Sequence, residues 1–186
     1  MNEQQDAAGT DEQPQVEFVA YAEDCRISGH MELHGDRLTD MLNRNEEFVL
    51  LDASVEALAD GRILTATEVP VARNELLAVH AVGPPGNPSR HVHTRQYPVV
   101  VRSGPYVIRG YLHAPPAVQP EEFARRRAMI PLSDAWIEYL AGGALRRSPV
   151  DTIVVNRNVA DSFDFAADED VAPPAAWRWS AKRNPQ

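Results

Sequence analysis

Two stretches of this chain repeat one pattern of glycine, aspartate and hydrophobic residues, and this repeat limits the possible folds more than any other feature. Three blocks recur in the same order, and the spacing between copies changes by only three residues across them. The aligned blocks are Cys25–Met31 with Tyr106–Leu112 at an offset of 81, Leu50–Leu58 with Leu132–Leu140 at 82, and Val69–Asn74 with Ile153–Asn158 at 84. The chain is therefore predicted to contain one small unit twice.

The repeat sets the predicted domain organisation. A stretch rich in proline and glycine, Gly83–Arg90, lies between the two copies and is typical of a linker. The expected parts are a disordered acidic N-terminal tail (1–15), a first unit (16–82), a Pro/Gly-rich linker (83–96), a second unit (97–165) and a flexible C-terminal tail (166–186).

Each unit is predicted to be mainly β. The first unit is expected to have strands at 17–21 and 26–33, a short helix beginning near Asp36, and strands around 48–58, 69–71 and 79–81. In the second unit, Pro120–Arg127 takes the place of the helix, with proline first, acids next and arginines last. A partly closed five-stranded barrel limits exposed strand edges in so short a unit. We therefore expect two tandem barrels, each with a helix after its second strand.

This order of elements resembles small SH3-like and Sm-like barrels. Ile27-x-Gly29, followed by Asp40-Met-Leu-Asn43 and the Arg73-Asn74 turn, resembles in outline the two signatures of Sm-type RNA-binding proteins. Arg37–Asn43 together with Phe48–Ala53 is more similar to a set of uncharacterised bacterial domains. That second resemblance covers most of the first unit and the outline of the second, and it implies no known activity.

A few charged or glycine positions are retained in both copies. They are Gly29 and Gly110, Asp52 and Asp134, Glu56 and Glu138, and Arg73 and Arg157. Active-site residues usually persist in one copy of a duplicated pair, whereas structural contacts are needed in both. We therefore expect the aspartate and the arginine to tie strand to turn within each unit. The alternative is a ligand site that occurs twice.

No cofactor and no catalytic activity are predicted. His91-x-His93 has the spacing of a metal-binding pair on one strand face, but the sequence offers no third ligand nearby, and exposed linker histidines are the better interpretation. Phosphate-binding loops, nucleophile elbows and HExxH motifs are missing from the sequence. Cys25 is the single cysteine, which excludes an internal disulfide and fits a half-buried strand residue.

Charge differs between the two units. The formal net charge of −9 disfavours nonspecific binding of nucleic acid by the whole chain. Residues 16–90 carry thirteen acids and six bases, whereas residues 91–165 carry seven acids and nine bases. Arg125, Arg126, Arg127, Arg146 and Arg147 supply most of the bases of the second unit and could form one anion-facing patch. Our hypothesis is that an acidic unit docks against a basic one, within or between molecules.

The C-terminal tail contains Trp177-Arg178-Trp179 after an acidic, proline-containing spacer. Aromatic and arginine anchors in a flexible end are typical of a docking peptide, and the alternative is a cap folded onto the barrels.

Together these features predict a cytoplasmic protein that is not an enzyme. Its start is polar and acidic, unlike a secretory signal, and its apolar runs are shorter than the roughly 20 residues of a membrane-spanning helix. We expect an assembly or adaptor component that works through protein contacts or self-association. The alternatives are a nucleic-acid binder that uses the basic second unit, and a module for a small ligand or a metal.

Overall fold

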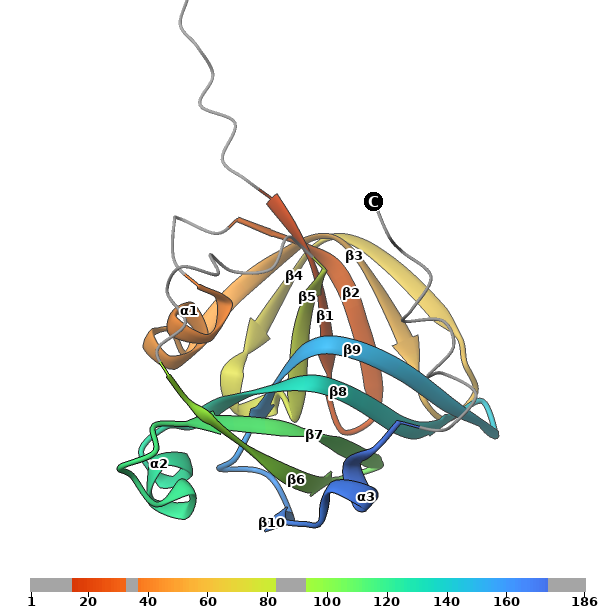
Figure 1. Cartoon of the computed structure of the whole chain (residues 1–186). Coiled ribbons are helices and arrows are strands. Elements are labelled where there is room, and N and C mark those ends of the chain that lie inside the picture. Colours follow the sequence, from red (N-terminus) through yellow and green to blue (C-terminus); the bar gives the residue numbers. More distant parts are fainter. Residues whose placement is uncertain (1–14, 33–36, 83–92, 174–186) are drawn as a thin grey trace, which may run out of the picture.

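The strands of the protein form one antiparallel sheet (Figure 1). The computed structural model describes residues 15–32, 37–82 and 93–173. Its ten strands lie in the order β10-β6-β7-β8-β9-β5-β1-β2-β3-β4. Their bounds are β1 Gln15–Tyr21, β2 Cys25–Glu32, β3 Glu47–Ala57, β4 Ile63–Ala72, β5 Ala78–Val82, β6 Arg95–Ser103, β7 Tyr106–Ala114, β8 Met129–Ala141, β9 Ala144–Asn156 and β10 Ser162–Phe165. The prediction of a mainly β protein is confirmed.

The two halves of the sheet have the same strand order. The first half reads β5-β1-β2-β3-β4, and the second half reads β10-β6-β7-β8-β9. Residues aligned by the repeat also have aligned partners. Ile27 faces Val55 and Ile108 faces Ile137. Likewise Val71 faces Phe48 and Val155 faces Ile130, so aligned residues hold corresponding places in the two halves.

The two barrels expected from the sequence are not found among the described strands. Within a half, the outer strands do not pair with each other to close a ring. Instead β5, the outer strand of the first half, pairs with β9 of the second half, and the sheet continues through both. The sheet is therefore open, and β4 and β10 lie at its two ends.

The hydrophobic core is shared between the halves. Tyr21, Leu77 and Ala78 belong to the first half, but they pack in a cluster made mostly of second-half residues. Conversely, Met129 and Val154 of the second half pack in the cluster of the first half. Each of the two clusters thus contains side chains of both halves, so burial of apolar surface stabilises the halves together.

Two helices lie where the sequence predicts them, and a third was not predicted. Helices α1 (Leu38–Arg44) and α2 (Pro120–Arg125) follow the second strand of each half. Helix α3 (Asp168–Val171) falls in the tail that was expected to be flexible. Its Val171 is fully buried, and the indole N–H of Trp136 donates a hydrogen bond to the Val171 carbonyl at 3.1 Å. The flexible-tail prediction is therefore wrong for this helix.

One predicted boundary moves, and one prediction about a side chain is confirmed. Strand β6 begins at Arg95, so the linker expected to end at residue 96 is shorter. Cys25 is a half-buried free thiol in β2, as predicted. None of the helices in the described part of the chain is long and apolar enough to cross a membrane.

The retained glycines and aspartates shape one bend in each half. The register between β2 and β3 shifts next to Gly29, and that between β7 and β8 shifts next to Gly110. A Cβ atom at Gly29 would lie 2.8 Å from the carbonyl oxygen of Leu51, too close for any side chain. Opposite the glycines, Asp52 and Asp134 have φ angles of 48° and 47°, a left-handed conformation that aspartate tolerates better than most residues. The repeat therefore retains these residues for a β-bulge.

Candidate functional site

Paired strands, two asparagine side chains and a group of tyrosine rings join the two halves of the described molecule. Strands β5 and β9 pair over two positions, Ala78 with Val155 and Val79 with Val154. The side chain of the buried Asn156 extends this pairing, because its amide N–H groups donate to the carbonyls of Arg73 and Leu76, each at 3.0 Å. A backbone hydrogen bond from Asn156 to the carbonyl of Leu77 completes the contact. Buried carbonyls need such partners, so Asn156 fixes the register of the junction.

A second asparagine joins α1 of the first half to β8 of the second half. The amide nitrogen of Asn43 donates to the carbonyl of Met129 at 3.0 Å, and its oxygen accepts the Met129 N–H at 3.2 Å. Asn43 also donates to the carbonyl of Thr39, within α1. The side chain thus acts as a backbone substitute at the start of β8, outside the strand pairing itself.

Three tyrosines fill the junction behind the paired strands. The ring of Tyr106 lies 5.3 Å from those of Tyr21 and Tyr139, and its hydroxyl donates to the carbonyl of Ala22 at 2.9 Å. Burial raises the pKa of Tyr21 to about 12 and raises the pKa of Tyr106 above its ordinary value. These phenols therefore stay neutral into the alkaline range in which an exposed tyrosine ionises, as suits a packed aromatic cluster.

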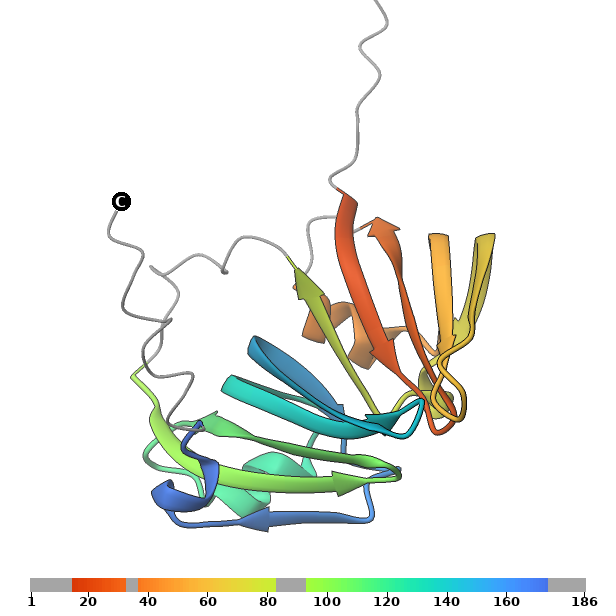
Figure 2. The ribbon, with the colours of Figure 1, turned by 90° about the vertical axis from the view of Figure 1, so that its right-hand side faces the viewer.

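The two ends of the sheet have no strand partner among the described residues (Figure 2). Strand β4 pairs with β3 alone, and β10 pairs with β6 alone. Most β4 side chains are exposed, and Ile63 and Leu64 are 62% and 72% exposed. Unpaired edges present free backbone N–H and C=O groups, which another strand can bind.

The retained aspartate and arginine do not tie strand to turn, so that prediction is wrong. The Arg73 guanidinium donates to the carbonyls of Leu42 and Asn43 at the end of α1 and lies 3.6 Å from the Glu46 carboxylate. Asp52 is exposed at the bulge and makes no ion pair among the described residues. The two residues are retained for separate reasons, a helix C-terminus and a left-handed bend.

We expect a double-mutant cycle on Asp52→Ala and Arg73→Ala to show a coupling energy near zero. Arg73→Ala alone should destabilise the protein by about 1 kcal/mol because two helix carbonyls lose a donor. Urea unfolding of the wild type, both single variants and the double variant measures the cycle. A coupling clearly above the error of the fits would instead restore a contact between the two side chains.

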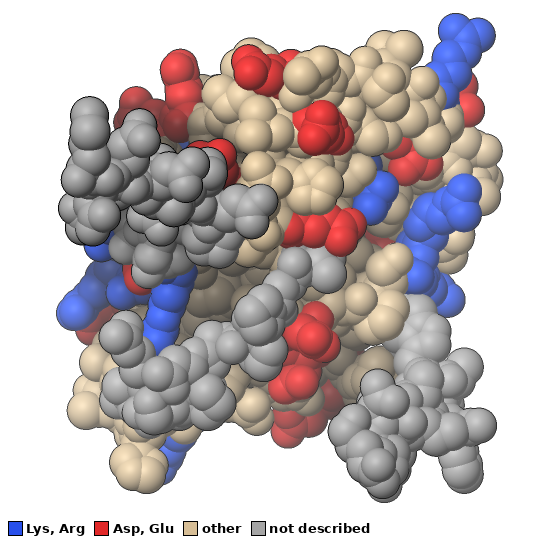
Figure 3. Space-filling view, turned by 90° about the horizontal axis from the view of Figure 1, so that it is seen from above, with Lys and Arg blue, Asp and Glu red and all other residues tan. Residues whose placement is uncertain are grey.

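The five arginines of the second half do not form one patch. Arg125, Arg126 and Arg127 precede the start of β8, whereas Arg147 faces Glu138 near its other end. Nine residues of strand separate these places by about 30 Å, at the usual rise per residue. Arg126 and Arg147 also pair with Glu122 and Glu138. On the face shown in Figure 3, acidic and basic side chains are interspersed, without one continuous basic area.

A serine–histidine contact that the sequence analysis missed lies between β7 and β8. His113 Nε2 is 2.7 Å from Ser133 Oγ, and its Nδ1 is 3.2 Å from Thr94 Oγ1. A catalytic triad needs a carboxylate where this threonine stands. His113 and Ser133 are separated by 20 positions, and no motif in the sequence links them. We interpret the contact as a cross-strand hydrogen bond.

The predicted histidine pair is described only in part. His93 is exposed just before β6, and His91 lies outside the described residues. In the part of the chain that the structure describes, no three histidine, cysteine or acidic side chains gather as metal ligands would.

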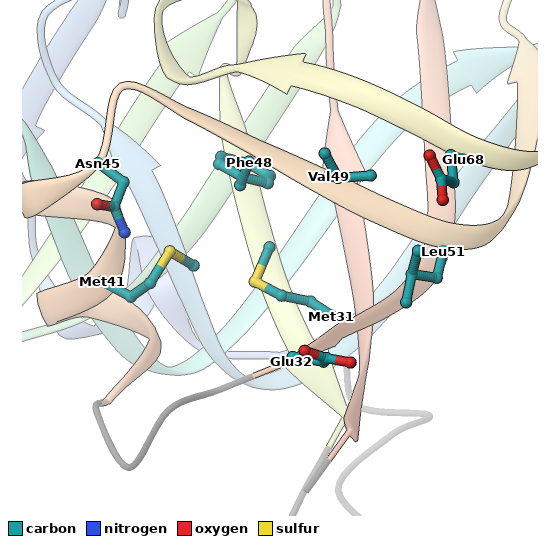
Figure 4. Close-up of a pocket in the computed structure, with 8 residues that line it drawn as sticks. All are labelled: Met31, Glu32, Met41, Asn45, Phe48, Val49, Leu51 and Glu68. Carbon is teal, nitrogen blue, oxygen red and sulfur yellow. The ribbon is translucent and has the colours of Figure 1, made fainter. Parts of the chain in front are cut away.

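A groove of about 510 Å³ lies between α1 and strands β2 to β4 (Figure 4). Met31, Met41 and Phe48 supply apolar surface, and the carboxylates of Glu32 and Glu68 stand at its rim. Such a groove suits an apolar group with a positive end. The counterparts of the two acids in the second half are His113 and Thr152, so the acidic rim is not repeated.

A wider groove of about 860 Å³ lies at the junction, where turns from both halves meet. It is lined by four acids, Glu23, Asp24, Glu75 and Asp161, and the Asp161 carboxylate accepts the N–H of Gly104 at 2.8 Å. This groove places negative charge beside the contact between the halves.

His80 on β5 is a half-buried titratable group beside the junction. Burial, followed by the nearby Arg26 guanidinium, lowers the pKa of His80 to about 4. The unfolded chain takes up this proton at about pH 6.5, but the folded protein does not, so stability falls as pH drops from 6.5 towards 4. We expect His80→Gln to remove this part of the acid sensitivity.

Urea midpoints at pH 7.5 and pH 4.5 measure the effect of His80. The wild type should lose more stability between these two values than His80→Gln, and His30→Gln, an exposed position on β2, should behave like the wild type. Equal losses in all three proteins would rule out His80 as the source.

Trp177, Arg178 and Trp179 lie outside the described residues. A comparison of the chain with protein-family models, curated proteins and solved structures found no match. The junction and the sheet edges are therefore the features of the described residues that bear on function.

Proposed function

We propose that this protein is a non-catalytic assembly component, built from a duplicated small β unit, which works by pairing its sheet edges with other protein chains. The observation that carries the proposal is the open sheet, whose outer strands β4 and β10 have no partner among the described residues. The chain already uses one edge pairing, β5 with β9, to join its own halves. Strand addition to a free edge is a common way for proteins to bind one another.

Two observations support protein contacts over the nucleic-acid alternative. Arg126 and Arg147 are paired with carboxylates, which reduces the positive charge available to phosphate groups. The arginine triplet before β8 and the arginine pair on β9 are also too far apart to act as one patch. The net charge of −9 adds to this argument.

Site-specific photo-crosslinking in cells tests the proposal. A photoreactive side chain is placed at Thr67 on β4 or at Asp164 on β10, both of which are exposed on outer strands. His30 is the control, because it is exposed on β2 and pairs with Glu17 of β1 on one side and with Leu51 of β3 on the other. We expect protein adducts from Thr67 and Asp164, but not from His30. Adducts from neither edge position would overturn the proposal.

A further inference from the structure

The internal junction defines what its two free ends can bind, and we propose that β10 of one molecule pairs with β4 of a second copy of this chain. The inference rests on the proposed function and names its partner. In the strand order of the two halves, β5 corresponds to β10 and β4 corresponds to β9. The internal junction pairs β5 of the first half with β9 of the second, so it joins a β5-type edge to a β4-type edge. β10 is the β5-type strand of the second half, and β4 is the free strand of the same type as β9. The same pairing therefore joins β10 to β4 of the next molecule, head to tail.

The register of this contact follows from the internal one. Ala78 and Val79 face Val155 and Val154 within the chain. At the repeat offset of 84, their counterparts are Ser162 and Phe163 on β10, and Val71 and Pro70 on β4. Ser162 of one copy should thus face Val71 of the next, and Phe163 should face Pro70.

The backbone of β10 is already set for this pairing. At the internal junction the N–H of Leu77 bonds to the carbonyl of Tyr21 at 2.8 Å, and at the free end the N–H of Asp161 bonds to the carbonyl of Arg102 at 2.9 Å. The same backbone hydrogen bond therefore precedes β5 and β10. At the internal junction the carbonyl of Leu77 accepts the N–H of Asn156. The Asp161 carbonyl is therefore placed to accept from Ala72 of another copy.

Side chains at the free ends are incompletely buried where their counterparts are covered. Val79 and Ile130 at the junction are 0% and 2% exposed, whereas Phe163 and Phe48 are both half-buried. A second copy would cover both phenylalanines. Pro70 has no N–H and replaces Val154, so this contact has one donor fewer than the internal one. The assembly should accordingly be weaker than the fold and depend on concentration.

The charges of the two ends are complementary. Glu47 begins β3 as Met129 begins β8, and Arg125 stands in α2 where Asn43 stands in α1. Since Asn43 bonds to Met129 across the internal junction, Arg125 of one copy should lie beside Glu47 of the next. Both side chains are exposed and make no ion pair among the described residues. The sequence predicted that an acidic unit docks against a basic one, and the pair of Glu47 and Arg125 is a specific contact of that kind.

A charge exchange tests the proposal on the full chain. Sedimentation velocity of the wild type should show association that grows with protein concentration and weakens with salt. Glu47→Arg and Arg125→Glu should each weaken association by about tenfold or more, because like charges then meet. An equimolar mixture of the two variants should associate again, as should the double variant, since every contact then joins opposite charges. Arg127→Glu is the matched control, and it should associate like the wild type.

The outcomes separate the two proposals. A wild-type chain that stays monomeric at every concentration overturns the self-pairing, as do single variants that associate like the wild type. Circular dichroism checks that each variant is folded, and rescue in the mixture excludes a folding defect. If the edge crosslinks contain a different protein and the wild type is monomeric, the assembly function stands and the self-pairing fails. If the crosslinks join peptides of this chain, both stand.

Discussion

Gly110→Ala is expected to lower the free energy of unfolding by about 1–3 kcal/mol, the usual cost of forcing extra atoms into a packed site. The added Cβ would lie 2.9 Å from Cβ of Ala135 and 3.0 Å from the carbonyl oxygen of Ser133. Both atoms belong to the bulged part of β8, which cannot retreat without changing the register with β7. The same change at Gly29 should cost a similar amount, because the added Cβ would lie 2.8 Å from the backbone carbonyl oxygen of Leu51.

Urea unfolding measures the effect, and a second substitution tests its cause. Ala135→Gly removes the nearest contact, so the double variant Gly110→Ala, Ala135→Gly should lose less stability than the sum of the two single variants. Gly143→Asn is the control: this turn glycine has a φ of 75° and nothing within 4 Å of an added Cβ, and asparagine tolerates that backbone. A stability of Gly110→Ala equal to that of the wild type would contradict the close approach.

The repeat correctly predicted which residues hold corresponding places in the two halves, but it did not predict how the strands join into a sheet. Alignment alone placed Ile27 with Ile108 and Val71 with Val155, and their partners across the strands agree. This worked because alternation and turn residues fix which way a strand faces and where it ends. The prediction that each unit closes on itself was wrong, because no local pattern decides which strand edge β5 joins.

The pairing of β5 with β9 depends on contacts between residues that are distant in the sequence. Asn156 bonds to carbonyls more than seventy residues away, and the Tyr106 hydroxyl bonds to Ala22. No local pattern marks these as junction residues, since an asparagine before a turn and a tyrosine opening a strand both have ordinary local explanations.

The candidate site was predicted only in part for a similar reason. Asp52 and Arg73 were recognised as structural because both copies keep them, yet their supposed contact was wrong. Retention shows that a position matters but not which neighbour it serves. The sequence predicted a role for Arg125 from its charge. Its proposed partner, Glu47, can be named only after the starts of β3 and β8 are matched.

Tyr106→Ala should have the largest effect of any single change proposed for this protein, a loss of about 3–5 kcal/mol as for other buried aromatic residues. The side chain is fully buried, and its ring contacts one tyrosine from each half. Its hydroxyl also bonds to first-half carbonyls, so Tyr106→Phe should cost about 1 kcal/mol. Since both halves use this ring, we expect amide exchange to increase in β2 and β3 as well as in β7 and β8.

Hydrogen exchange distinguishes a shared core from two independent ones. Tyr97→Ala is the matched control, because Tyr97 packs on Phe165 at the far side of the second half, at a ring distance of 6.4 Å. It should speed exchange near β6 and β10 and leave the first half as in the wild type. If Tyr106→Ala also left β2 and β3 protected, the halves would be separate folding units. Faster exchange in both halves would show that the junction holds them together as one unit. Only then is the position of β4 fixed relative to that of β10, as the proposed pairing of the two edges requires.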